Sequence, residues 1–194
     1  MSVSESLEKL GDILDIKSPT LRQHLQPGLT RAEVQAALSP HGITPPEELY
    51  ELYGWYNGTN DRFGHGSVFG DHQFLPFDEA VELYQRVKKG HCEINLEKCF
   101  PFASYFGEIC AIYCDPTPVL GFQYPIIKIF HTKVLYYENL DLMIQTVTEW
   151  FASGIYETVE SLNSPLKGEI MRRINSRLPY PNHVFICYTS KSAT

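Results

Sequence analysis

Apolar residues recur at intervals of three and four along six stretches of the chain, a spacing that places them on one face of a helix. In the first stretch, Leu7, Leu10 and Leu14 alternate with acidic and polar residues. Thr30 and Glu33 supply the two halves of a capping box before the second stretch. The predicted helices cover residues 4–14, 31–38, 45–56, 78–89, 140–151 and 167–177.

Between these helices the pattern changes to short runs of aromatic and β-branched residues bounded by Gly, Pro and Asp, which is typical of β-strands. The expected extended segments are residues 68–69, 74–76, 100–103, 109–114, 119–124, 126–130 and 134–137. We therefore expect an α+β fold with N-terminal helices and a C-terminal helical tail. Between them we expect a mostly antiparallel sheet of about five or six strands, packed against helices on one face.

The length of 194 residues suits one domain with an appended tail. We expect an α+β domain over residues 1–155 and a C-terminal helical extension over residues 156–194 that packs on the same domain. Within the extension, residues 155–163 are expected to continue the preceding helix, and residues 183–188 form an apolar run that could dock as an added strand. The last residues are expected to be disordered.

The stretch over residues 45–61 gives the sharpest local prediction. Two prolines suit the first turn of a helix, and the two glutamates that follow face the positive end of the helix dipole. Asn57 and Gly58 are expected to end this helix, because both tolerate the left-handed conformation needed there. Its aromatic residues are expected to pack in the core, except Trp55, which lies off the main apolar stripe and is a candidate for lining a surface groove.

The chain has 16 basic and 23 acidic residues, giving a net charge of −7. This balance argues against nucleic acid as a partner and makes a basic protein the natural electrostatic complement, although solubility alone also explains it. A polar N-terminus and the lack of a long apolar run predict neither a signal peptide nor a membrane span. Five cysteines without a C-x-x-C pair indicate reduced thiols and a cytoplasmic location.

Few residues carry recognisable catalytic chemistry, and no cofactor is expected. The densest group of metal-ligand and acid–base side chains is Asp61, His65, Asp71 and His72. These residue types suit a metal or proton-transfer site, but they occupy a Gly-rich segment with no helix to fix them, so surface histidines are the simpler interpretation. His91 with Cys92 or Cys99 could form a nucleophile pair, but it lacks a third residue to orient it.

Four stretches, in order along the chain, resemble the SUKH superfamily, which includes fungal cell-wall-assembly regulators of the Smi/Knr type and bacterial immunity proteins. The run over residues 49–58, Leu-Tyr-Glu-Leu-Tyr-Gly-Trp-Tyr-Asn-Gly, is similar to the family's helix end. Phe-Leu-Pro-Phe-Asp-Glu-Ala at 74–80 resembles its strand-to-helix step. Phe-Pro-Phe-Ala at 100–103, followed by Gly-Glu-Ile at 107–109, resembles its entry into the central strands, and the helix over 140–151 matches its amphipathic helix. In one departure, Tyr105 and Phe106 stand where the family often has a polar loop.

The resemblance implies a protein-binding module without enzymatic activity, most often an immunity protein that neutralises a toxin, or a regulatory scaffold. A basic toxin would suit the acidic chain. The expected contact residues are Trp55, Asn57, Asp61, Tyr105 and Glu108, although Asn57 could serve the turn alone and Glu108 could simply solvate a sheet edge. Two alternatives stay open: a metal-dependent hydrolase that uses the four-residue Asp/His group, and a small-ligand sensor with a pocket between sheet and helices. The oligomeric state is left open.

Overall fold

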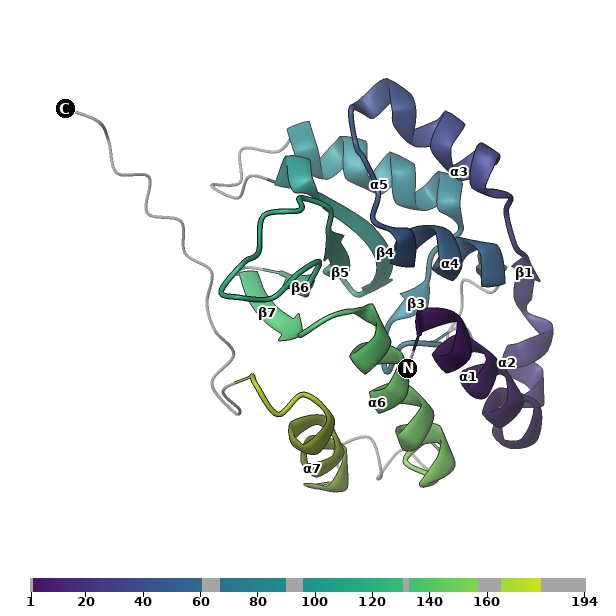
Figure 1. Ribbon diagram of the computed structural model, residues 1–194. Helices are drawn as coiled ribbons and strands as arrows, with labels where there is room; N and C mark the ends of the chain where they lie inside the picture. Colours follow the sequence, from purple (N-terminus) through teal and green to yellow (C-terminus); the bar gives the residue numbers. More distant parts are fainter. Residues whose placement is uncertain (1, 61–66, 90–95, 131–132, 157–164, 179–194) are drawn as a thin grey trace.

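The computed structural model of the protein describes residues 2–60, 67–89, 96–130, 133–156 and 165–178 and has an α+β fold (Figure 1). Its helices are α1 (Val3–Lys17), α2 (Pro19–Gln23), α3 (Arg31–Leu38), α4 (Glu47–Trp55), α5 (Phe77–Lys89), α6 (Leu140–Ala152) and α7 (Pro165–Ile174), with 3₁₀ helices η1 (Ser39–His41) and η2 (Leu96–Lys98). Its strands are β1 (Leu25–Pro27), β2 (Tyr56–Thr59), β3 (Gln73–Phe74), β4 (Cys99–Tyr105), β5 (Glu108–Tyr113), β6 (Ile126–Ile129) and β7 (Lys133–Tyr137). The predicted fold class is confirmed.

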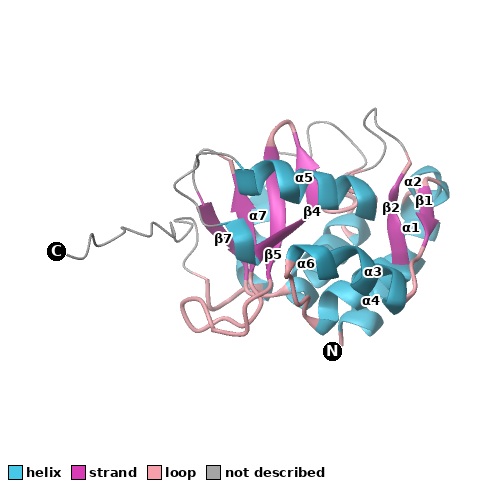
Figure 2. Ribbon diagram, turned by 90° about the horizontal axis from the view of Figure 1, so that it is seen from above, coloured by secondary structure: helices cyan, strands magenta, loops and turns pink. Residues whose placement is uncertain are grey.

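Five strands form one antiparallel sheet in the order β3-β4-β5-β6-β7, while β1 and β2 pair separately. Because β4 to β7 follow one another both in sequence and in space, each neighbouring pair is joined by a direct connection. Figure 2 shows α1 to α4 and the β1–β2 pair beside this sheet, on the side away from β7. Within the described part of the chain, no helix is long and apolar enough to cross a membrane.

Local sequence signals determine where several helices begin. Ser2 and Thr30 each accept a hydrogen bond from the N–H three residues later, and the glutamate at that position bonds back to the cap backbone. The capping box predicted at Thr30 is thus confirmed. Asn139 caps α6 by accepting the N–H of Leu142. Each of these caps supplies an acceptor for helix N–H groups that have no partner within the helix.

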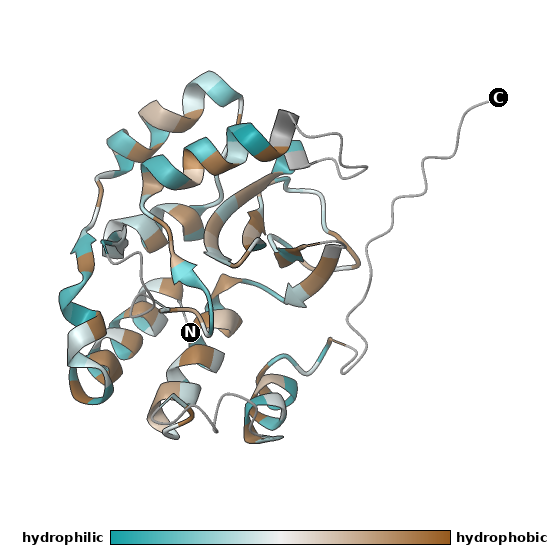
Figure 3. Ribbon diagram, turned by 180° about the vertical axis from the view of Figure 1, so that it is seen from behind, coloured by the Kyte–Doolittle hydropathy of each residue, from teal (hydrophilic) through white to brown (hydrophobic). Residues whose placement is uncertain are grey.

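Helices cover both faces of the sheet, so the prediction of helices on one face was wrong. Alternation along β5 sends Cys110 and Ile112 into the core that includes α1, α4 and α6. Ala111 points to the other face, where Val87 of α5 packs over it and Ile127. Both faces of β5 are buried because its sequence is apolar at nearly every position. In Figure 3 the central strands are mainly hydrophobic, and the helices carry both hydrophobic and hydrophilic residues.

The segment over residues 119–124, predicted as a strand, is a loop that contains an isolated bridge between Val119 and Phe122. Leu120 and Tyr124 have φ angles of 53° and 50°. A β-strand requires negative φ throughout, so these two residues interrupt any extended run. The aromatic and β-branched composition of the segment suggested a strand, but its residues form the connection between β5 and β6.

Helix α4 ends at Trp55, and the chain enters β2 directly, so the prediction that Asn57 and Gly58 end this helix was wrong. Tyr56, expected to be the last residue of the helix, is already extended, with φ and ψ of −149° and 151°. Gly58 does have the expected positive φ, at 72°, but it lies within β2. The positive φ of Gly58 is therefore needed within β2 and not at the end of the helix.

Gly58 lies at a close crossing between β2 and the segment that leads into α5. The Asn57 Oδ1 accepts the N–H of Phe77, the first residue of α5, at 2.8 Å. A Cβ on Gly58 would stand 2.2 Å from the backbone nitrogen of Pro76 and 2.4 Å from the carbonyl carbon of Leu75. Only glycine allows two backbones to approach this closely while also adopting a positive φ.

Helix α7 packs on α6 through buried polar contacts as well as apolar side chains. The Trp150 indole N–H donates to the carbonyl of Lys167 at 3.1 Å. The buried Asn175 donates to the hydroxyl of Thr146 at 3.1 Å and accepts the N–H of Glu138 at 3.4 Å. These bonds attach the described part of the C-terminal extension to the rest of the domain.

Three expectations for the C-terminal extension fall on residues outside the described ranges. They are the continuation of the helix over 157–163, the added strand over 183–188, and disorder of the last residues. Residues 155–156, also expected to continue the helix, form a turn after α6 instead, and Gly154 before them has a φ of 77°.

Replacing Gly58 with alanine should destabilise the domain by at least about 3 kcal/mol, because the methyl group adds a backbone clash to the cost of a positive φ. Gly42→Ala is a matched control, since Gly42 has a φ of 67° but nothing lies within 4 Å of a Cβ placed there. The control should lose about 1 kcal/mol from its backbone angle alone. Urea unfolding measures both losses. Equal losses would show that the crossing does not constrain the fold.

Candidate functional site

The β4–β5 hairpin places two exposed aromatic residues at its turn. Tyr105 and Glu108 pair across the hairpin, so Phe106 and Gly107 form a two-residue turn with φ angles of 43° and 89°. Positive angles at both positions are typical of a type I′ turn, which usually takes Asn and Gly. Phe106 therefore holds a backbone angle that costs a non-glycine residue about 1–2 kcal/mol. It is 90% exposed, and Tyr105 is 45% exposed.

A third exposed aromatic residue, Phe130, follows β6 at the same end of the sheet. The pairing of Ile109 with Ile129 sets the end of β6 beside the start of β5. A ring carbon of Phe130 lies 3.6 Å from the position that a Cβ on Gly107 would take. We call Tyr105, Phe106 and Phe130 the aromatic tip.

Next to the aromatic tip, three polar residues from separate strands and loops come together. His72, just before β3, has its Nε2 3.5 Å from the Oε2 of Glu108 on β5. The Nζ of Lys128 on β6 lies 3.5 Å from the same oxygen. We call these residues the His72 cluster. Strand register assembles it, because β3 pairs with the end of β4, and Cys110 of β5 pairs with Lys128.

The imidazole of the His72 cluster is buried between aromatic rings. Its centroid lies 6.3 Å from those of Tyr105 and Tyr136, and the Lys128 Nζ lies 4.9 Å from the Tyr136 centroid. Burial lowers the pKa of His72 below its ordinary value of 6.5, against the opposing effect of the Glu108 carboxylate. Among the described residues, the Nε2 of His72 has no hydrogen-bond partner. The ring is therefore mainly neutral at pH 7, and it faces the Glu108 carboxylate without a hydrogen bond to it.

The neighbouring Asp71 interacts with α7 instead. Its Oδ2 lies 3.3 Å from the Nζ of Lys167. The same ammonium lies 4.9 Å from the ring centroid of Trp150 and 5.6 Å from that of Tyr156, which are cation–π distances. This ion pair links the loop before β3 to the C-terminal helix.

The structure describes two of the four residues in the predicted metal or acid–base group, because Asp61 and His65 lie outside the described ranges. The other two are adjacent in sequence but interact with different partners: Asp71 pairs with a lysine, whereas His72 faces a glutamate. Across the described residues, no group of three or more His, Cys, Asp or Glu side chains is arranged to hold a metal ion.

The described cysteines are structural. Cys99, Cys110 and Cys114 are reduced thiols, and all three are buried. Burial raises the pKa of the Cys110 and Cys114 thiols well above the ordinary value of 9. A protonated, buried thiol acts as a small apolar side chain and not as a nucleophile. His91 and Cys92, the other members of the predicted nucleophile pair, lie outside the described residues.

The two predicted contact residues near the end of α4 take part in internal packing. Trp55 is half-buried, with ring atoms 3.8 Å from the position of a Cβ on Gly11 and its ring perpendicular to that of Tyr56 at 4.8 Å. The side chain of Asn57 bonds the start of α5. Of the predicted contact residues, Tyr105 and Glu108 lie together in the structure. Trp55 and Asn57 instead contact other parts of the domain.

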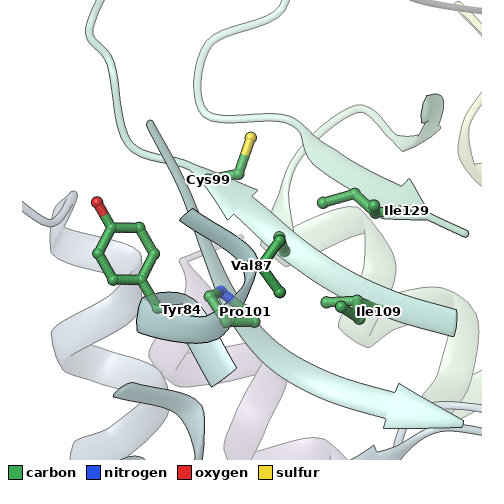
Figure 4. Close-up of a pocket in the computed structure, with 7 residues that line it drawn as sticks. Tyr84, Val87, Cys99, Pro101, Ile109 and Ile129 are labelled. Atoms are coloured by element: carbon green, nitrogen blue, oxygen red, sulfur yellow. The ribbon is translucent and has the colours of Figure 1, made fainter. Parts of the chain in front are cut away.

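A small cavity lies between α5 and the sheet (Figure 4). Its lining residues are Tyr84, Val87, Cys99, Pro101, Ile109, Ala111 and Ile129. The cavity has a volume of about 10 Å³, roughly the space of one water. Because pockets for small molecules have volumes of about 300 Å³ or more, this cavity gives no support to the small-ligand sensor hypothesis.

A larger groove of about 550 Å³ opens between the N-terminal parts of α1, α4 and α6. Glu47, Glu48 and Glu51 of α4 line it together with Asp141 of α6. Burial raises the pKa of Glu48, and the two neighbouring glutamates raise it further. The sequence did not reveal this acidic groove, because the α4 glutamates are explained there by the helix dipole and Asp141 lies about 90 residues away in the chain.

No protein-family model matches the chain, and no curated protein matches it significantly. The resemblance to the SUKH superfamily therefore stays a prediction. Two of the stretches that carry it do contact each other in the structure, since Asn57 and Gly58 cross Leu75 to Phe77.

Asn57→Ala should destabilise the domain by about 1–2 kcal/mol, because it removes the acceptor for the first N–H of α5. Asn57→Asp keeps an acceptor there and adds a charge that the helix dipole favours, so it should stay close to wild-type stability. Urea unfolding of both variants checks this. Wild-type stability in the alanine variant would instead leave Asn57 available as a contact residue.

The lowered pKa of His72 predicts a pH dependence of stability. Between the folded-state pKa and the ordinary value of 6.5, the unfolded chain binds more protons, so stability rises with pH. This contribution is fully present above pH 6.5 and is lost as the pH falls below it. Glutamine does not titrate. Wild type should therefore lose stability relative to His72→Gln as the pH falls from about 7 to about 5. Urea unfolding across this range measures it, and a constant difference would contradict it.

Proposed function

We propose that the protein is a non-enzymatic protein-binding module, acting as an immunity protein that neutralises a toxin or as a regulatory scaffold. In this proposal the aromatic tip is the contact surface. The contact surface also includes the neighbouring Glu108, so it retains Tyr105 and Glu108 from the sequence prediction and adds Phe106 and Phe130. Trp55 and Asn57 are assigned to internal packing instead.

The exposure and backbone strain of Phe106 carry the proposal. A phenylalanine at this turn position costs local stability where Asn or Gly would not, and its side chain is 90% exposed. Strained residues that the surrounding fold holds in place are found preferentially at functional sites. Exposed aromatic rings are also the side chains that contribute most to binding energy in protein interfaces.

The electrostatics support a basic partner. The chain has a net charge of −7, and the Glu108 carboxylate lies beside the aromatic tip with its side chain 31% exposed. The acidic groove adds negative charge elsewhere on the same domain. Opposite fields speed association of two proteins, while aromatic contacts slow their separation. An acidic surface with an apolar tip suits a basic toxin of the kind implied by the resemblance.

Phe106→Asn should weaken partner binding by at least about 30-fold, the effect of losing roughly 2 kcal/mol at an interface hot spot. Asparagine tolerates the positive φ, so the variant should keep or slightly exceed wild-type stability. The partner would be isolated from the source cells by photo-crosslinking from position 106. Its Kd for the purified variants would then be measured by calorimetry.

The matched control is Leu120→Asn. Leu120 is also exposed, at 60%, and also has a positive φ, of 53°, but it lies in the loop between β5 and β6. Its replacement should leave the Kd unchanged. The proposed surface would be excluded if the Phe106 variant bound as well as wild type, or if both variants lost the same affinity.

A further inference from the structure

His72 connects a buried titratable group to the proposed contact surface. Its ring contacts Tyr105 of the aromatic tip, and its Nε2 faces Glu108, which pairs with Tyr105 across the hairpin. The His72 side chain is 5% exposed, and the 3.5 Å separation from the carboxylate lies at the outer limit of a hydrogen bond. A proton on Nε2 would therefore create a charge-assisted hydrogen bond where the neutral Nε2 of His72 makes none.

We propose that protonation of His72 acts as a switch on the hairpin, drawing the Glu108 carboxylate inward and weakening partner binding under mildly acidic conditions. This switch rests on the proposed binding role of the aromatic tip. It adds a form of regulation to that role.

The charges around the imidazole determine how the switch responds. Among the described residues, the carboxylates of Glu108 and Asp71 favour its protonated form, and the ammonium of Lys128 opposes it. The rings of Tyr105 and Tyr136 pack beside the imidazole, and a hydrogen bond to the backbone of Phe69 also favours the protonated form. After protonation, the Nε2–H donates to the Glu108 Oε2, the oxygen that Lys128 also approaches. The carboxylate then shifts from the lysine toward the interior.

This shift reaches the contact surface because Glu108 begins β5 and flanks the turn at Phe106 and Gly107. Moving its carboxylate inward removes negative charge from the surface offered to a basic partner. The coupling is reciprocal: a partner that covers the aromatic tip removes more water from His72 and so disfavours its protonation. Proton binding therefore weakens partner binding by the same free energy by which partner binding weakens proton binding.

NMR titration of the isolated protein tests the switch directly. The ring signals of His72 and the backbone amides of residues 105–108 would be followed between about pH 8 and about pH 5. We expect the amides to shift with the same midpoint as the His72 ring. Glu108→Gln should move the His72 midpoint to lower pH, because the neutral amide no longer stabilises the imidazolium.

His72→Gln should abolish the shift of these amides with pH, whereas His24→Gln is a control that should leave it unchanged. His24 follows α2, where its Nδ1 lies 3.0 Å from the Oδ1 of Asn60. The switch would be overturned if the hairpin amides did not follow the His72 ring, or if their shift persisted in His72→Gln. Should that variant not fold, an unchanged His72 midpoint in Glu108→Gln would overturn it.

The outcomes distinguish this proposal from the proposed function. The NMR experiment needs no partner, so a titration uncoupled from the hairpin overturns the switch and leaves the binding role untouched. A coupled titration together with unchanged affinity in Phe106→Asn would instead overturn the binding role. Where a purified partner is in hand, its affinity for wild type should fall from about pH 7 to about pH 5.5, and its affinity for His72→Gln should fall less.

Discussion

The close crossing of two backbones at Gly58 fixes how the N-terminal helices sit on the sheet. Three hydrogen bonds near the crossing extend its effect. Asn57 bonds the start of α5, Thr59 donates to the carbonyl of Phe74 at 3.1 Å, and Tyr53 donates to that of Leu75 at 3.3 Å. Because β3 pairs in turn with β4, the position of α4 determines where the first strand of the sheet begins. A methyl group at Gly58 would disturb all of these contacts together.

The aromatic tip depends on this framework. Phe106 can occupy an unfavourable angle because β4 and β5, which flank it, are paired along their length and buried over most of it. The free-energy cost of the strained turn is small compared with the stabilisation that the buried strands provide. The His72 cluster is positioned by the same strands, since His72 comes just before β3, whose first residue pairs with Ser104. The rigid part of the fold thus supports both the exposed rings and the titratable group beside them.

Local interactions were the part of this structure that the sequence could predict. The capping box at Thr30 depends on two residues three positions apart, and it is present. Contacts between residues far apart in the sequence could not be predicted. The contact between His72 and Glu108 arises from strand register, and nothing in the sequence indicates that these two residues meet. The positive φ of Phe106 was also hidden, because an aromatic pair before Gly107 suggests the end of a strand and not a turn.

The packing of α1 on α6 joins two helices that lie far apart in the sequence. Val3, Leu7, Leu10 and Leu14 of α1 are buried, and the hydroxyl of Ser6 donates to Asp141 at 2.5 Å. On the ribosome, the first helix would be released long before α6 is synthesised, an interval on the order of ten seconds at ordinary translation rates. Throughout that interval its leucines lack their final cover. The apolar face of α1 is therefore a part of the nascent chain that needs chaperone shielding until α6 has been synthesised.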